Sequence, residues 1–268
     1  MINIKTSSNL LSIFAYLVPI ALLTGPFLPD LFVSLTAIIF ILIQLILKEK
    51  KYFNNYIIFF LLSFYFFCII SSLISESIFF SLKSSFVYFR FIIFSLAIWY
   101  LIENNKNFIK YFSYILITTM TIGFLTGYYQ YFYSETILGK EVVGNRLYLI
   151  FSDNLILGQL LSRLFPLSIA LIMLRKKYSI KIYLLLFFLF IATDTVIYLS
   201  GERTALGLII LSSFLMLLFI NKLRLFRFFT LTTSIIIIII ISLLNPSIKE
   251  RNIDQTFNQM GLSNSNSK

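Results

Sequence analysis

The 268-residue sequence contains no histidine and a single cysteine, Cys68. Histidine is the commonest metal ligand and the usual general base near neutral pH, so its absence removes both roles. One cysteine cannot form an intrachain disulfide, and Cys68, which lies in an apolar run, is interpreted as a small core residue. No glycine-rich nucleotide loop, nucleophile elbow or paired-carboxylate motif is present. We therefore expect no cofactor, no metal and no nucleotide-driven reaction.

Charged residues are also scarce. They make up 12% of the chain, whereas hydrophobic residues make up 59% and the mean hydropathy is +0.92. Soluble domains usually carry about 25% charged residues. Several apolar runs approach or exceed about 18 residues, enough to cross about 30 Å of hydrocarbon as helices. The runs are continuous and do not alternate with polar residues, which argues against a β-barrel. The sequence thus predicts an all-α, polytopic bundle of transmembrane helices.

The apolar runs predict about nine spans. The first lacks a small-residue cleavage site, so we expect it to be retained and not removed as a signal peptide. Residues 1–244 are expected to form the transmembrane domain, and residues 245–268 the start of a periplasmic segment. The predicted spans are 9–25, 29–47, 55–74, 85–102, 111–128, 155–174, 180–199, 204–220 and 228–244.

The net charge of +11 is explained by topology. With the N-terminus in the cytoplasm, the inner loops carry thirteen cations, Arg227 among them, against two acids. The remaining nine cations balance nine acids. Such an excess is what the positive-inside rule predicts for a cytoplasmic N-terminus and a periplasmic C-terminus. We expect contacts with membrane lipids and no nucleic-acid partner.

Arg203 is the most informative of the remaining cations. It lies in "YLSGERTALGLIIL", at the outer start of the span 204–220. A helix N-terminus favours anions, and a guanidinium can bind phosphate oxygens through two parallel hydrogen bonds. Gly201 leaves room for close backbone approach. Two interpretations stay open: a phosphate or diphosphate site, or an interfacial arginine that reaches headgroups or pairs with Glu202.

Asp194 lies inside the span 180–199, about 9 Å below its outer end. An acid at this depth needs a partner. We favour a structural ion pair that orients Arg203 over a proton relay.

Four further charged residues have structural interpretations, and for two of them a second interpretation stays open. Lys83 and Arg90 lie seven residues apart, on one helical face that could point into the bundle or into an aromatic belt. Arg146 is expected to pair with Asp153 in the long outer segment 129–154. Asp30 is expected to cap its helix.

Arg163 lies deeper, in the span 155–174. It is a candidate partner for a carboxylate such as Asp153 or Asp194.

The stretch "LSGERTALGLIIL" resembles the signature of the O-antigen ligase and polymerase family of bacterial inner-membrane glycosyltransferases. In that signature a small residue, glycine, a variable residue and Arg-Thr/Ser-Ala open a transmembrane helix. Three other stretches are similar to the same family and follow in the same order along most of the chain: "PIALLTGPFLPDLFVSL", "NRLYLIFSDNLILGQLLSRLFPL" and "NPSIKERNIDQT".

The resemblance implies a substrate and a site. Family members transfer a glycan from undecaprenyl diphosphate to lipid A–core or another acceptor on the periplasmic face, without metal or nucleotide. Arg203 matches the signature arginine, and Arg251 lies at the place of a second one. Other candidate residues on the same side are Arg146, Arg90 and Lys83 for substrate binding, with Glu202 and Asp194 in support.

The sequence departs from the family where a histidine in a large periplasmic loop is thought to activate the acceptor. This chain has no histidine and ends soon after that segment begins, so we expect a truncated product that lacks this base. Glu202 and Glu250 are the acids nearest the arginines. The alternatives are an O-antigen polymerase, a non-catalytic remnant and a polysaccharide transporter subunit.

Overall fold

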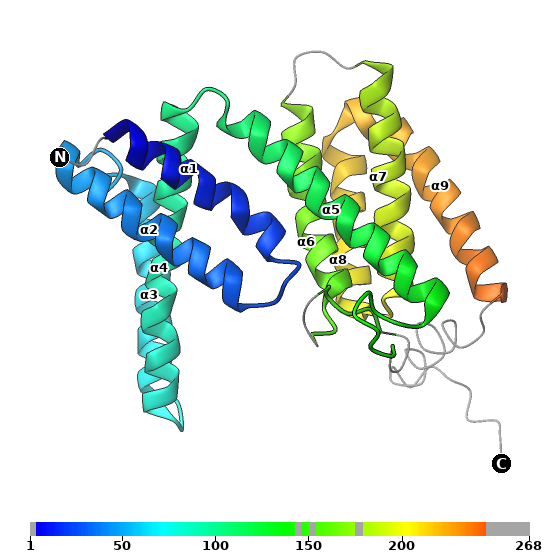
Figure 1. Cartoon of the computed structure of the whole chain (residues 1–268), viewed down its shortest axis with the longest axis horizontal. Coiled ribbons are helices and arrows are strands. Elements are labelled where there is room, and N and C mark those ends of the chain that lie inside the picture. Colours follow the sequence, from blue (N-terminus) through cyan, green and yellow to red (C-terminus); the bar gives the residue numbers. More distant parts are fainter. Residues whose placement is uncertain (1–3, 143–145, 151–153, 175–178, 245–268) are drawn as a thin grey trace. The chain divides into compact units, whose positions relative to one another are not determined.

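A computed structural model describes residues 4–142, 146–150, 154–174 and 179–244 of the chain. Within these residues the structure consists of nine α-helices and contains no strand, apart from one isolated bridge between Glu135 and Glu141. The expected all-helical class is confirmed. The helices, drawn in Figure 1, are α1 (Ile4–Ala21), α2 (Phe27–Leu47), α3 (Tyr56–Leu73), α4 (Ile78–Asn104), α5 (Phe108–Tyr133), α6 (Leu157–Met173), α7 (Ile180–Leu199), α8 (Arg203–Phe219) and α9 (Asn221–Leu244).

Each predicted span corresponds to one helix, and the largest differences lie at two helix starts. α4 begins at Ile78 and α9 at Asn221, seven residues before the predicted spans. In both cases serine, lysine or arginine interrupts the apolar run without ending the helix, because these residues are acceptable in helices even where they are poor membrane residues. Hydropathy therefore marks the apolar part of these helices and misses their first turns.

Six helices, α2, α3, α4, α5, α7 and α9, are long and apolar enough to cross a membrane. Three further apolar segments are shorter: Ser7–Ala21 in α1, Leu157–Met173 and Arg203–Phe219. The described chain thus has the helices of a multi-pass membrane protein.

The helices fall into two compact units. Among the described residues, unit 1 comprises those of 1–22 and 26–112, and unit 2 comprises those of 23–25 and 113–244. The transmembrane domain expected over residues 1–244 therefore contains two compact units, and α5 begins in the first and continues in the second.

Unit 1 is built on α4, against which α2 and α3 pack, and α1 lies along α2. Its core is aromatic: the ring of Phe40 meets Tyr52 and Tyr100 edge-on at 6.0 and 5.8 Å between centroids. Serines join α3 to α4, with 2.5 Å between the hydroxyls of Ser72 and Ser85. Most side chains of α3 are exposed and apolar, as expected for a surface that faces lipid.

Unit 2 is built on α7, which packs against α6 and α9 and carries the largest buried share among the candidate spans. Gly123 and Gly127 of α5 lie one turn apart and let α5 approach its neighbours closely. A Cβ would lie 2.9 Å from Leu161 Cδ2 at the first position and 2.6 Å from Val196 Cγ1 at the second. Small residues serve this purpose in many membrane helices, because they let backbones pack together.

Candidate functional site

The sequence-predicted site lies at the short turn from α7 to α8. Ser200 ends α7, Gly201 has a φ of +64°, and Glu202 is the N-cap of α8 in an extended conformation. Glycine is the residue that adopts a positive φ without steric cost. The turn therefore needs Gly201 for its backbone, and the two charged residues follow at once.

Glu202 is buried, with 8% of its surface exposed, and its carboxylate points to a different helix. Its Oε1 accepts a hydrogen bond from the backbone N–H of Gly158 at 2.8 Å, and its Oε2 accepts one from Gln159 at 3.1 Å. Both N–H groups belong to the first turn of α6, whose own N-cap, Ile156, provides no side-chain cap. Glu202 thus caps α6 from 44 residues away, and does not cap its own helix.

Gly158 is the residue that makes this capping possible. A Cβ at Gly158 would overlap Ser200 Oγ and would lie 2.9 Å from Ser200 Cβ and 3.1 Å from Glu202 Oε1. A second link joins the same helix starts, because Gln159 Nε2 donates to Thr204 Oγ1 at 2.9 Å. The N-termini of α6 and α8 are therefore held side by side.

Arg203 is the first residue of α8, and it is partly exposed. Each helix N-terminus carries about half a positive charge. The two helix termini and Arg203 contribute positive charge here, and the Glu202 carboxylate contributes negative charge. A guanidinium and the N–H groups of helix termini are groups that bind anions.

Asp194 pairs with Arg227 and not with Arg203, so the expected ion pair between Asp194 and Arg203 is wrong. The guanidinium of Arg227 donates to both Asp194 oxygens, at 2.8 and 2.9 Å, and also to Ser213 Oγ at 2.5 Å. Arg227 is completely buried. The rings of Phe190 and Phe165 lie 4.8 and 5.5 Å from its guanidinium carbon.

Arg227 was expected in a cytoplasmic loop, and its placement in a loop is wrong because it lies within α9, which begins at Asn221. A sequence signal existed: Arg227, Thr230 and Ser234 are spaced by three and four residues, so they form one polar stripe on the helix. All three are buried in the structure. The stripe shows that α9 turns a polar face inward.

In unit 1, Arg90 of α4 pairs with Asp30 of α2 at 2.8 Å. The expectation that Asp30 caps α2 is wrong, because the N-cap is Pro26 and no side chain caps this helix start. Asp30 lies inside the first turn, where its carboxylate reaches Arg90. Lys83 shares α4 with Arg90 but is exposed. Both candidates belong to unit 1, whereas Arg203 belongs to unit 2.

The remaining candidates are placed only in part. Arg146 is exposed in the segment between α5 and α6. Arg163 is exposed on α6 and does not pair with Asp194, so that suggested partnership is wrong.

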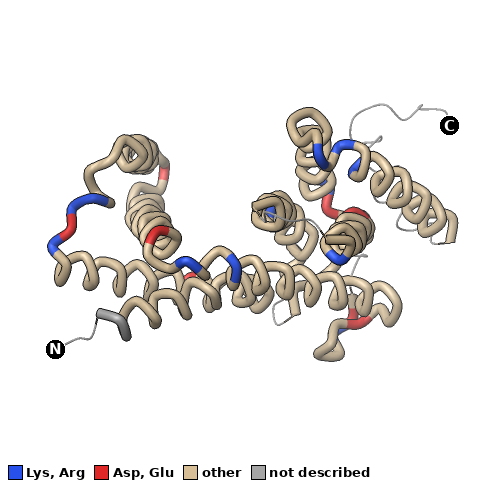
Figure 2. Tube along the Cα trace, turned by 90° about the horizontal axis from the view of Figure 1, so that it is seen from above, with Lys and Arg blue, Asp and Glu red and all other residues tan. Residues whose placement is uncertain are grey.

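Asp153, Glu250 and Arg251 lie outside the described residues. Within the described ranges, no three His, Cys, Asp or Glu side chains gather as metal ligands would. Figure 2 shows the lysines, arginines and acids along the chain.

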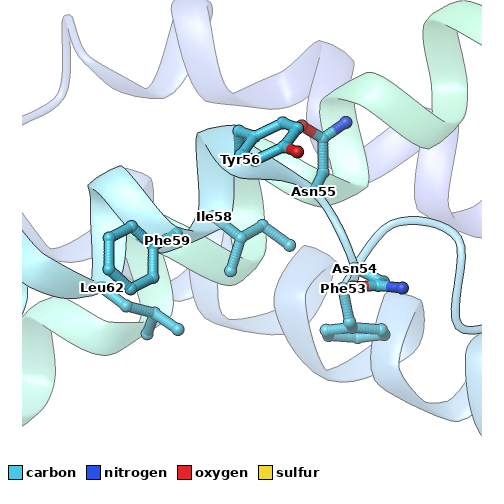
Figure 3. Close-up of a pocket in the computed structure, with 7 residues that line it drawn as sticks. All are labelled: Phe53, Asn54, Asn55, Tyr56, Ile58, Phe59 and Leu62. Carbon is cyan, nitrogen blue, oxygen red and sulfur yellow. The ribbon is translucent and has the colours of Figure 1, made fainter.

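A pocket of about 840 Å³ lies in unit 1, at the start of α3 (Figure 3). Its lining includes the rings of Phe53, Tyr56 and Phe59 and the amides of Asn54 and Asn55. None of its lining residues is charged, and none is a predicted site residue. The pocket lacks the cationic groups that a diphosphate needs.

The comparisons with known proteins give no relative. No family model, no curated protein and no solved structure matches this chain. The function must therefore be argued from the residues and their arrangement.

Proposed function

We propose that this chain is a glycan transferase of the O-antigen ligase type, which binds an undecaprenyl-diphosphate-linked glycan at the turn between α7 and α8. The observation that supports this proposal best is the position of Arg203. It opens α8 beside the N-terminus of α6, so a guanidinium and two helix starts, both of which are groups that bind phosphate, lie close together. The stretch that resembles the family signature covers this turn.

The proposed topology has nine spans, with the N-terminus in the cytoplasm and the turn on the periplasmic side of a bacterial inner membrane. α6 and α8 have 17 residues each and so a length of about 25 Å, which is less than the roughly 30 Å of the hydrocarbon core. Helices of this length are accommodated by local thinning of the bilayer, so in this proposal their starts lie at the outer boundary of the hydrocarbon, next to the lipid headgroups. A diphosphate carried on a polyprenyl chain arrives at this same depth.

In this proposal Arg203 binds the diphosphate of the donor. Charge develops on the diphosphate as its bond to the glycan breaks, and a fixed guanidinium stabilises that charge in the transition state. The hydroxyl oxygen of lipid A–core or of a related glycan forms the new bond to the glycan, undecaprenyl diphosphate leaves, and the hydroxyl proton passes to water. No metal and no nucleotide take part in the proposed step.

Replacing Arg203 tests the assignment directly. In nanodiscs, Arg203→Ala is expected to weaken binding of undecaprenyl diphosphate at least about tenfold, and Arg203→Lys to recover only part of it, because lysine lacks the planar fork. Arg224→Gln is the matched control: Arg224 is an exposed cation beyond the opposite end of α8, where it donates to the carbonyls of Leu217 and Leu218. Equal donor affinity in wild type and Arg203→Ala would contradict the proposal.

The orientation has its own test, because the chain has a single cysteine. In a Cys68→Ser background, new cysteines at Leu138 and Lys50 are to be labelled with a membrane-impermeant maleimide. Both positions are exposed in the structure. We expect labelling of Leu138→Cys in intact spheroplasts and of Lys50→Cys only after lysis. The reverse pattern would place the Arg203 turn in the cytoplasm and exclude a periplasmic reaction.

A further inference from the structure

The two residues that flank Arg203 along the chain are both tied to α6. Glu202, before it, accepts two hydrogen bonds from Gly158 and Gln159. Thr204, after it, accepts one from the Gln159 side chain. The backbone of Arg203 is therefore held on both sides by the same turn of the same neighbouring helix.

The two ties differ in burial. Glu202 and Gly158 are buried, whereas Gln159 is partly exposed and Thr204 is exposed. The hydrogen bonds to Glu202 join an ionised acceptor to backbone donors in a buried place, which makes them the stronger of the two ties. Since Gly158 has no side chain, the carboxylate can lie directly against the start of α6.

We infer that Glu202 is a positioning residue for the donor diphosphate: it fixes the start of α8 to α6 and so orients Arg203. This inference rests on the proposed function. The carboxylate has two further consequences for the site. Its negative charge is directed at the N–H groups of α6, which reduces its repulsion of a bound phosphate. Both of its oxygens accept hydrogen bonds from backbone N–H groups, an arrangement that suits a fixed anion better than a general base.

A fixed arginine binds better than a mobile one, because the cost of ordering its backbone has already been met during folding. Glu202→Gln is expected to weaken binding of undecaprenyl diphosphate about tenfold, since the amide offers a single oxygen and no charge to the two N–H donors. Gln159→Leu removes the outer tie alone and is expected to weaken binding about threefold. The double variant should approach Arg203→Ala.

The experiment measures the dissociation constant of undecaprenyl diphosphate for purified, monodisperse full-length chain in nanodiscs, together with its thermal unfolding. Tyr198→Phe is the matched control. It removes the hydrogen bond between Tyr198 and Ser242, 2.6 Å long, from the same end of α7, and leaves both ties to α6 in place. We expect it to lower the unfolding temperature without changing the dissociation constant.

The outcomes separate the inference from the proposed function. If Arg203→Ala leaves binding unchanged, the proposed function fails. If Arg203→Ala weakens binding and Glu202→Gln does not, the proposed function stands and Glu202 has no positioning role. If Glu202→Gln lowers only the unfolding temperature, as Tyr198→Phe should, its role is structural and the inference is overturned.

Discussion

Both units contain an arginine–aspartate pair that joins two helices, but the surroundings of the two pairs differ. In unit 1, Arg90 and Asp30 lie 2.8 Å apart with 23% and 49% of their side chains exposed. In unit 2, Arg227 and Asp194 also lie 2.8 Å apart, with 0% and 7% exposed. The same contact distance thus occurs in one place that is partly open at the surface of the protein and in another that is enclosed by it.

The difference shows why distance alone does not measure an ion pair. An exposed charge that loses its partner is solvated again, so the pair contributes little to stability. A buried charge that loses its partner stays in a medium that cannot solvate it, and the loss is large. We therefore expect the Arg227 pair to hold α7 and α9 together and the Arg90 pair to make only a minor contribution.

The largest effect is expected for Asp194→Asn. This change leaves the guanidinium of Arg227 buried without a counter-charge, and should lower the free energy of unfolding by about 3–5 kcal/mol. Unfolding by a denaturing detergent, followed by circular dichroism, measures the change. The double variant Asp194→Leu with Arg227→Met should lose much less, because it removes both charges together. A loss below about 1 kcal/mol for Asp194→Asn would remove the contrast between the two pairs.

Gly158 allows a second buried carboxylate of unit 2, that of Glu202, to be tested, because the two residues lie against each other. In Gly158→Ala the new methyl group meets Ser200 and Glu202, and overpacking of this kind costs about 1–3 kcal/mol. Gly207→Ala in α8 is the control, because a Cβ there has no neighbour within 4 Å. The control should be neutral or up to about 1 kcal/mol stabilising, since alanine is a better helix former. Equal free energies of unfolding for Gly158→Ala and Gly207→Ala would show that the start of α6 accommodates the extra methyl group without strain.

A smaller effect is expected for Arg90→Gln, which removes the partner of Asp30. The change should cost less than about 1 kcal/mol, because both side chains are partly exposed. The cost should shrink further between low salt and about 1 M salt, where exposed charges are screened. Parallel detergent unfolding of Arg90→Gln and Asp194→Asn at both salt concentrations gives the measurement. A loss as large as that of Asp194→Asn would mean that exposure does not separate the two pairs.

The smallest effect near neutral pH is expected for Tyr52→Phe in unit 1. Burial and the hydrogen bond to Glu103 raise the pKa of Tyr52 from its ordinary value of 10.0 to about 12. The folded state thus favours the neutral phenol. Its contribution to stability is complete below pH 10 and is lost as the pH rises toward 12. The free energy of unfolding, measured over this range, should decrease more steeply with pH for wild type than for Tyr52→Phe. Parallel curves would show that another group causes the alkaline loss.

The sequence predicted the helices well, because helix formation and apolar length are local properties of the chain. The span expected at 180–199 matches α7, and Arg203 opens α8 as its place before the apolar run predicted. The failures concern partners. Asp194 was assigned to Arg203, a near neighbour in sequence, whereas its partner is 33 residues away on α9. Hydropathy gives the length of a helix, but not which of its faces turns toward which neighbour.

By itself, the sequence determined that the described chain is helical, that several of its helices are apolar enough to cross a membrane, and that an arginine opens α8 after a glycine turn. These features follow from residue composition and spacing along the chain. Only the tertiary structure decided that Glu202 caps α6 and that Arg227 is buried against Asp194. Both contacts depend on how helices are rotated and packed against each other. That arrangement is set by many side chains together, here with Gly158 leaving the space that the Glu202 carboxylate occupies.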